Sequence, residues 1–165
     1  MKVNEQFNDW SISKELFDFI RQTIPVGSTI LELGSGYGTK ALSMWYTMYS
    51  IEDDPKFVNL FNSTYCHAPI KQYDGYQWYD DKVVGEFVKD IDYDLLLIDA
   101  PIGAKYGRSG FLQHTELFNM NVPVVVDDTH RDEERMLSQW LFDMYPFREI
   151  LRIPDPKKEA TVLIH

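Results

Sequence analysis

Three glycines at alternate positions, directly after a short apolar run, constrain this chain more than any other feature. The run Ile30–Leu33 contains one acid, Glu32, and Gly34, Gly36 and Gly38 follow it. This pattern predicts a strand, a turn too tight for side chains, and a helix immediately afterwards. Glycine has no Cβ, so the backbone of such a turn can adopt positive φ and let a ligand approach closely. The free N–H groups of the first helical turn would then face that ligand.

Segments typical of strands and helices alternate along most of the 165 residues. The expected strands are 29–33, 48–52, 65–70, 93–98, 122–126, 147–153 and 160–164. The expected helices are 13–24, 39–46, 56–62, 83–89, 112–118 and 131–144. Several strands are apolar throughout, which indicates burial on both faces. The sequence therefore predicts a single α/β domain over residues 1–165. Its sheet is Rossmann-like, doubly wound and mostly parallel, with an antiparallel C-terminal edge hairpin, because no helix separates the last two strands.

Composition narrows the class of partner. Acidic side chains number 26 against 16 basic ones, for a net charge of −10, so nucleic acid is not expected as a partner. The hydrophobic fraction of 44% excludes a disordered chain. The single cysteine, Cys66, cannot form an internal disulfide, which favours a reducing compartment. No signal peptide is visible, and no apolar stretch approaches the roughly 20 residues of a membrane span. We expect a cytoplasmic protein with no membrane partner. The sequence is also compatible with a homo-oligomer.

The glycine spacing departs from the dinucleotide fingerprint G-x-G-x-x-G. The third glycine of that fingerprint would stand where this chain has Thr39. Glu32 would repel a pyrophosphate and attract an ammonium group. A nicotinamide-dependent oxidoreductase is therefore the less favoured interpretation.

The segment Glu32–Gly38 resembles motif I of the class I S-adenosylmethionine-dependent methyltransferases, and the resemblance extends over nearly the whole chain. It implies that Glu32, Gly34, Ser35, Gly36 and Gly38 hold the amino-acid end of S-adenosylmethionine. The two terminal strands are similar to the antiparallel edge hairpin of that family.

A second acid stands 20 residues after Glu32, where the resemblance implies contact with the ribose hydroxyls. This acid is Glu52, followed by Asp53, and ionised carboxylates suit a diol because each oxygen can accept from one hydroxyl. The alternative is that Glu52 or its neighbours cap the next helix.

The resemblance implies that the loop after the third strand lines the adenine. Asp74, Gly75 and Tyr76 are the candidates, since an aspartate can accept from the exocyclic amine and an aromatic ring can stack on the base. The alternative is a surface turn at Asp74–Gly75.

Three further acids follow apolar strands that the fold would place beside the glycine turn. Asp99 follows the fourth strand, and Asp127 and Asp128 follow the fifth. Three crowded carboxylates favour a bound cation, and their oxygens suit Mg²⁺. The arrangement is similar to the metal-dependent O-methyltransferases, although the residues after Asp99 differ from theirs. The alternative is that Asp127 or Asp128 caps the following helix.

Methylation of a hydroxyl requires a group that takes its proton. Asp99, His130 and Lys105 are the candidate catalytic residues, and Arg108 either binds an acidic acceptor or pairs with a surface acid. The sequence thus predicts methyl transfer from S-adenosylmethionine to a hydroxyl of a small molecule or sugar, with Mg²⁺ as a candidate cofactor. The alternative from another class is a catalytically silent protein that binds S-adenosylmethionine.

Overall fold

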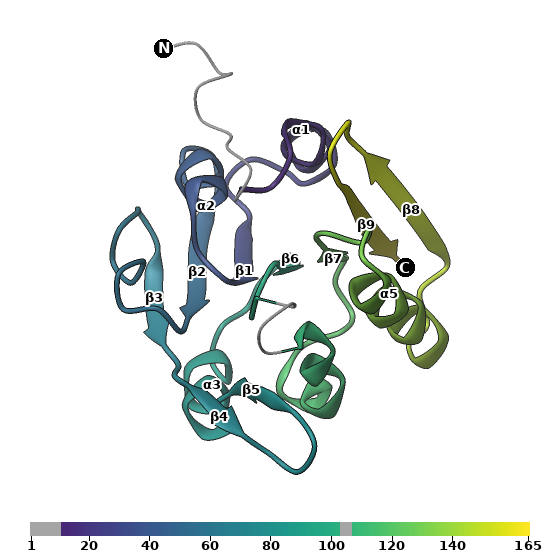
Figure 1. Ribbon diagram of the computed structural model, residues 1–165. Helices are drawn as coiled ribbons and strands as arrows, with labels where there is room; N and C mark the ends of the chain where they lie inside the picture. Colours follow the sequence, from purple (N-terminus) through teal and green to yellow (C-terminus); the bar gives the residue numbers. More distant parts are fainter. Residues whose placement is uncertain (1–10, 103–106) are drawn as a thin grey trace.

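A seven-stranded sheet organises the described part of the chain, residues 11–102 and 107–165 of the computed structural model. In sheet order its strands are β3 (Thr64–His67), β2 (Thr47–Glu52), β1 (Thr29–Leu33), β6 (Leu95–Ile98), β7 (Val124–Val126), β9 (Glu159–Ile164) and β8 (Glu149–Pro154). The first five run parallel, and β9 and β8 form an antiparallel hairpin at one edge (Figure 1). The predicted fold class is therefore confirmed. The strand order reverses direction between β1 and β6, which is where ligands bind in open α/β sheets.

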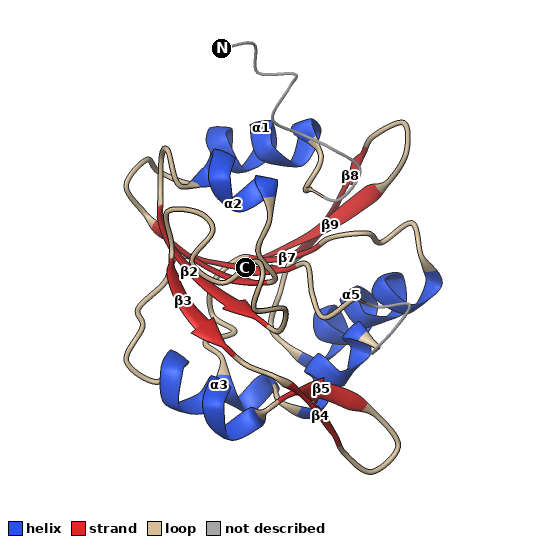
Figure 2. Cartoon of the chain, turned by 60° about the vertical axis from the view of Figure 1, so that its left-hand side comes forward, coloured by secondary structure: helices blue, strands red, loops and turns tan. Residues whose placement is uncertain are grey.

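Helices cover both faces of this sheet. Figure 2 shows α1 (Lys14–Thr23) and α2 (Tyr37–Leu42) above it, and α3 (Asp81–Val88) and α5 (Asp132–Met144) below it. The described residues also include the 3₁₀ turns η2 (Arg108–Gln113) and η3 (Thr115–Leu117) and a small antiparallel hairpin of β4 (Ile70–Gln72) and β5 (Gln77–Tyr79). No helix among the described residues is both long and apolar enough to cross a membrane.

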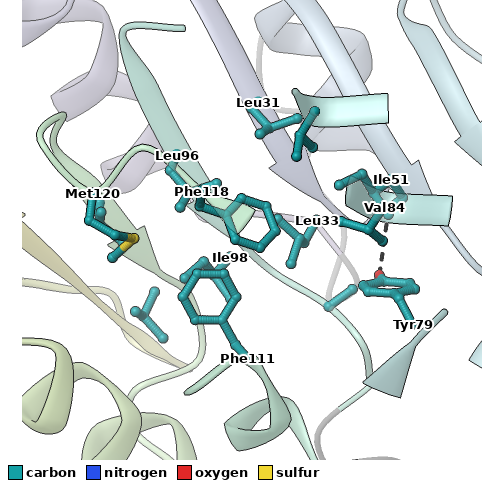
Figure 3. Close-up of a cluster of buried hydrophobic side chains, with 14 of the residues drawn as sticks. Leu31, Leu33, Ile51, Tyr79, Val84, Leu96, Ile98, Phe111, Phe118 and Met120 are labelled. Atoms are coloured by element: carbon teal, nitrogen blue, oxygen red, sulfur yellow. Dashed lines mark hydrogen bonds between the residues drawn. The ribbon is translucent and has the colours of Figure 1, made fainter. Parts of the chain in front are cut away.

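The apolar strands divide their side chains between two buried clusters. Ile30 packs with Leu16 and Ile20 of α1, whereas its neighbour Leu31 packs with residues of α3 and α5 on the other face. In the cluster that contains Leu31, the buried Tyr79 hydroxyl donates a hydrogen bond to the carbonyl oxygen of Ile51 at 3.5 Å (Figure 3). Strands buried on both faces explain why the apolar runs are continuous rather than alternating.

Three sequence-based expectations about local structure are wrong. Residues 56–62 form turns rather than a helix: the Asp54 carboxylate accepts from the N–H of Lys56, and Asn59 has φ +61°. The expected strand 65–70 is divided into β3 and β4, because Pro69 has no N–H to donate. The segment 112–118 forms 3₁₀ turns rather than an α-helix. The other predicted helices and strands are present, with their ends shifted by a few residues.

Candidate functional site

The carboxyl ends of the parallel strands bring most of the predicted site residues to one edge of the sheet. Backbone hydrogen bonds continue the ladder beyond the strand ends, from Gly34 N to Ile51 O (2.8 Å), Asp99 N to Leu33 O (3.0 Å) and Asp127 N to Ile98 O (3.0 Å). The glycine turn, Glu52, Asp99 and Asp127 therefore share this edge, as the doubly wound topology predicts.

The glycine turn lies directly against the end of β6. Gly34 has φ +94°, and a Cβ on it would stand 2.7 Å from the Cβ of Ala100, which is closer than real Cβ contacts allow. A Cβ on Gly38 would stand 3.0 Å from Ile12 Cγ1, a tight contact with a side chain. Gly36 N donates to Thr39 Oγ1 at 2.9 Å and so fixes the first turn of α2. Glycine is thus required at Gly34 both by conformation and by space.

Glu32 lies beneath the turn, where it is only 3% exposed. Its Oε1 accepts hydrogen bonds from Thr39 Oγ1, at 2.7 Å, and from Ser50 Oγ, at 2.5 Å. Burial raises the pKa of Glu32 to about 8, against an ordinary value of 4.5. The carboxyl therefore ties α2 to β2 from below, and direct contact with a ligand stays a prediction.

We expect Glu32→Gln to remove part of the pH dependence of stability. The folded protein holds the Glu32 proton up to about pH 8, whereas the unfolded chain releases it near pH 4.5, so this group lowers the free energy of unfolding as pH rises between these values. The glutamine still accepts from Thr39 and Ser50 but cannot ionise. Urea titrations measure the free energy of unfolding at each pH. Between about pH 5 and about pH 9, this free energy should rise in the variant by a few kcal/mol relative to the wild type. A constant difference between the two across that range would contradict the assignment.

Glu52 reaches across to the glycine turn. Its Oε2 accepts from Ser35 N at 2.8 Å and its Oε1 from Asp54 N at 2.9 Å, and burial raises its pKa. Each oxygen keeps a second lone pair for a ligand hydroxyl. The helix-capping alternative is wrong, because no helix follows β2 in residues 53–63. Asp53 is half-buried beside Glu52, with its carbonyl oxygen 3.2 Å from His67 Nε2.

Sequence reasoning missed Tyr65, which supports the same turn. Its hydroxyl lies 2.7 Å from Ser35 Oγ and accepts from Phe61 N at 3.3 Å. Tyr65 pairs with Ser50 across β3 and β2, so only the strand register, not a sequence motif, places it here.

The three candidate adenine residues lie at the tip of the β4–β5 hairpin. Tyr73 N donates to Tyr76 O at 2.9 Å, and Asp74 and Gly75 are exposed between them. The Tyr76 ring stacks on Tyr73, and its hydroxyl lies 3.0 Å from His114 Nε2. The residues directly after β3 are instead Ala68 and Pro69, which the sequence did not single out. Contact of Asp74, Gly75 or Tyr76 with adenine stays a prediction.

Asp99, Asp127 and Asp128 meet at the ends of β6 and β7, with one carboxylate oxygen of each within 4.8 Å of the others. Asp127 is 1% exposed, whereas the side chain of Asp99 is 27% exposed. Burial, followed by the negative charge of Asp127, raises the pKa of Asp99 well above its usual range, and burial also raises the pKa of Asp127. Asp128 has φ +62°, which turns the chain away from β7. We call these three residues the acid cluster.

Basic side chains of the chain itself enter the acid cluster. Lys158 Nζ lies 3.2 Å from Asp127 Oδ2, and Arg131 Nη1 lies 3.2 Å from Asp128 Oδ2. Arg108, which is 2% exposed, places Nη2 3.4 Å from Asp128 Oδ2 and 3.7 Å from Asp99 Oδ1. The sequence offered Arg108 as an acceptor-binding residue or as the partner of a surface acid. In the structure it is instead buried and pairs with acids of the cluster.

The helix-capping alternative for Asp127 and Asp128 is wrong. The N-cap of α5 is Arg131, and among the described residues no side chain caps the helix; Arg131 N donates instead to the backbone carbonyl of Asp128 at 2.9 Å. The carboxylates of both aspartates therefore belong to the acid cluster and do not cap α5.

The acid cluster is a poor fit for Mg²⁺ as it stands. Magnesium requires oxygen ligands in near-octahedral geometry and keeps several waters. Asp127 Oδ1 is buried without a hydrogen-bond partner among the described residues and would suit such an ion. The other side of Asp127 and one oxygen of Asp128 are occupied by Lys158, Arg131 and Arg108. A divalent ion would therefore compete with cations of the chain itself for oxygens of Asp127 and Asp128.

Of the other two candidate catalytic residues, His130 lies in the described part of the chain. His130 is exposed in the turn between β7 and α5. Lys105 lies outside the described residues. Asp99 is therefore the described candidate that joins the acid cluster and is also open to the edge of the sheet.

Solved structures similar to this chain are methyltransferases or methyltransferase-like proteins. A methyltransferase-like protein from Silicibacter pomeroyi is 14% identical, with a TM-score of 0.56 over 95% of this chain and 90% of the other. The methyltransferase PaMTH1 of Podospora anserina, solved with S-adenosylhomocysteine, is 15% identical, with a TM-score of 0.54 over 99% and 82%. MycE, a methyltransferase of mycinamycin biosynthesis solved with Mg and S-adenosylhomocysteine, is 13% identical, with a TM-score of 0.55 over 98% of this chain and 48% of its own.

No family model matches the sequence, and no curated protein is significantly similar to it. At these identities the structural likeness shows the fold.

Proposed function

We propose that this chain, whose fold is that of the class I S-adenosylmethionine-dependent methyltransferases, binds S-adenosylmethionine and transfers its methyl group to a hydroxyl of a small molecule or sugar. The observation that carries the proposal is the hydrogen bond between Ser35 N and Glu52 Oε2. It joins the glycine turn to the acid at the end of β2, at the switch point of the sheet. Such an arrangement suits a ligand with an amino-acid end and a ribose diol.

The residues of the chain would orient the two reactants and manage one proton. The bound cofactor would supply an electrophilic methyl group on a sulfonium. The acceptor hydroxyl must lose its proton during transfer, and we expect the partly exposed Asp99 to take it onto its carboxylate. Its raised pKa makes Asp99 a stronger base than an exposed aspartate. Binding in the crevice beside the glycine turn would hold the acceptor in line with the methyl group.

The proposal has two rivals, and calorimetry followed by an acceptor assay separates them. We expect S-adenosylhomocysteine to bind with a stoichiometry of one and far more tightly than NADH; the reverse order would favour a nicotinamide oxidoreductase. Labelled S-adenosylmethionine is then incubated with a panel of hydroxylated small molecules, sugars, amines and carboxylates. Label on hydroxyls supports the proposal, and label on amines or carboxylates would correct the acceptor class. Tight binding without transfer to any acceptor would favour the silent binding protein.

We expect Glu52→Gln to weaken binding of S-adenosylhomocysteine by roughly 10- to 100-fold. A hydrogen bond to a charged group contributes about 1.5–3 kcal/mol. In the variant, a neutral amide replaces the charged carboxylate that would accept from the ribose hydroxyls. Calorimetry at a fixed pH measures the change. Glu149→Gln, on the exposed edge strand β8, is the matched control and should bind like the wild type. Equal affinity of Glu52→Gln and the wild type would show that Glu52 does not bind the cofactor.

The same calorimetry on Asp74→Asn tests the predicted contact of Asp74 with adenine.

A further inference from the structure

The acid cluster contains its own cations, and we propose that Arg108 and Lys158 are the resident cations of this site, in the place that a divalent metal ion would take. This inference concerns the charge balance of the folded chain and stands whether or not the protein transfers a methyl group. It is an alternative to the magnesium ion that the crowded acids predict from the sequence.

Arg108 is held in the cluster by more than ion pairs. Its Nη2 donates to Asp99 O at 2.6 Å, its Nη1 to Asp127 O at 2.8 Å and its Nε to Pro101 O at 3.4 Å. These carbonyls belong to the ends of β6 and β7, so the planar guanidinium joins the two strand ends. With its direction fixed in this way, its charge lies between Asp99 and Asp128. Arg108 is thus a positioning residue for the Asp99 carboxylate.

Lys158 enters the cluster from a different part of the chain. It lies in the turn between β8 and β9, and its Nζ contacts both Asp127 Oδ2 and the carbonyl oxygen of Ser11. Its side chain is only 12% exposed. The ammonium group therefore occupies one face of the most deeply buried acid of the cluster.

The charge count shows why a further cation is not required. Glu134, 1% exposed, lies 4.0 Å from Arg108 Nε and 3.7 Å from Arg131 Nη1, and brings a fourth carboxylate to the network. Three cations, on Arg108, Arg131 and Lys158, face these four acids, so the network has one negative charge more than it has positive charges. A divalent ion would leave an excess of positive charge unless it expelled Arg108 or Lys158 from its buried position.

Titration with Mn²⁺, followed by the paramagnetic resonance of the free ion, tests this proposal. We expect weak binding to the wild type and binding roughly 10- to 100-fold tighter to Lys158→Met, because the variant frees Asp127 Oδ2 beside the unpartnered Oδ1. Adding Asp127→Asn to Lys158→Met should abolish the gain. Arg108→Met should gain affinity in the same way, and Arg135→Met, which removes an exposed cation of α5 paired with Asp132, should not.

Two results would overturn the proposal. One is a wild type that binds a single Mn²⁺ as tightly as Lys158→Met; the other is a folded Lys158→Met variant with no gain in affinity. If Arg108→Met does not fold, the lysine variants still decide. Binding of S-adenosylhomocysteine to the same samples reports separately on the proposed function, and its failure would leave the charge balance of the cluster unaffected.

Discussion

Replacing Arg108 with methionine should lower the free energy of unfolding by about 3–5 kcal/mol, because the change leaves buried acids without their cation. Asp99, Asp128 and Glu134 each lose a nearby positive charge. The carbonyl oxygens of Asp99 and Asp127 lose a donor as well. Methionine restores most of the buried volume, so the loss reports on charge and hydrogen bonding rather than on a cavity. Urea unfolding at pH 7 measures it.

Two further variants define what the Arg108 result means. Arg135→Met removes a solvent-exposed ion pair with Asp132, and its cost should stay within about 1 kcal/mol. Arg108→Lys keeps the charge but cannot bond several carbonyls with one planar group, so it should fall between wild type and Arg108→Met. A cost for Arg108→Met no larger than that of Arg135→Met would mean that the cluster does not depend on its internal cation.

The positions of the acids were predictable from sequence, whereas the groups that neutralise them were not. Asp99 and Asp127 each follow an apolar run, and parallel strands bring their carboxyl ends to one edge, so topology alone places these acids together. Arg108 and Lys158 arrive from a 3₁₀ turn and a hairpin turn, 20 residues from Asp128 and 31 residues from Asp127 respectively. No periodicity or motif connects residues at such separations.

The same distinction holds for the cofactor side of the site. The strand, glycine turn and helix at residues 29–42 follow from local rules, because each step depends on neighbouring residues. The segment after Pro55 has local signals for a helix, yet side-chain capping by Asp54 and the positive φ of Asn59 produce turns. The hairpin β4–β5 also carries Asp74–Tyr76 beyond the strand end, because β4 and β5 pair with each other rather than joining the main sheet.

Gly34→Ala should give the second large effect, a loss of about 2–5 kcal/mol in stability together with loss of S-adenosylhomocysteine binding. Two causes act at this position. At φ +94° an L-residue is strained, which costs about 1–2 kcal/mol. The new Cβ would also stand 2.7 Å from Ala100 Cβ, and a clash of this kind in a packed region costs about 1–3 kcal/mol. Relief of the clash must move the turn or the end of β6, and either movement would disturb the N–H groups that we propose face the ligand.

Two other glycines separate these causes. Gly27 has φ +89° with open space around it and is not a predicted site residue, so Gly27→Ala should show the conformational cost alone and leave binding unchanged. Gly38 lies in α2 without positive φ, and its new Cβ would meet only Ile12, a side chain that can shift by a few tenths of an ångström. Urea unfolding and calorimetry on all three variants should therefore place Gly34→Ala lowest in both stability and affinity. If Gly38→Ala lost binding while Gly34→Ala kept it, the ligand would contact the start of α2 rather than the turn against β6.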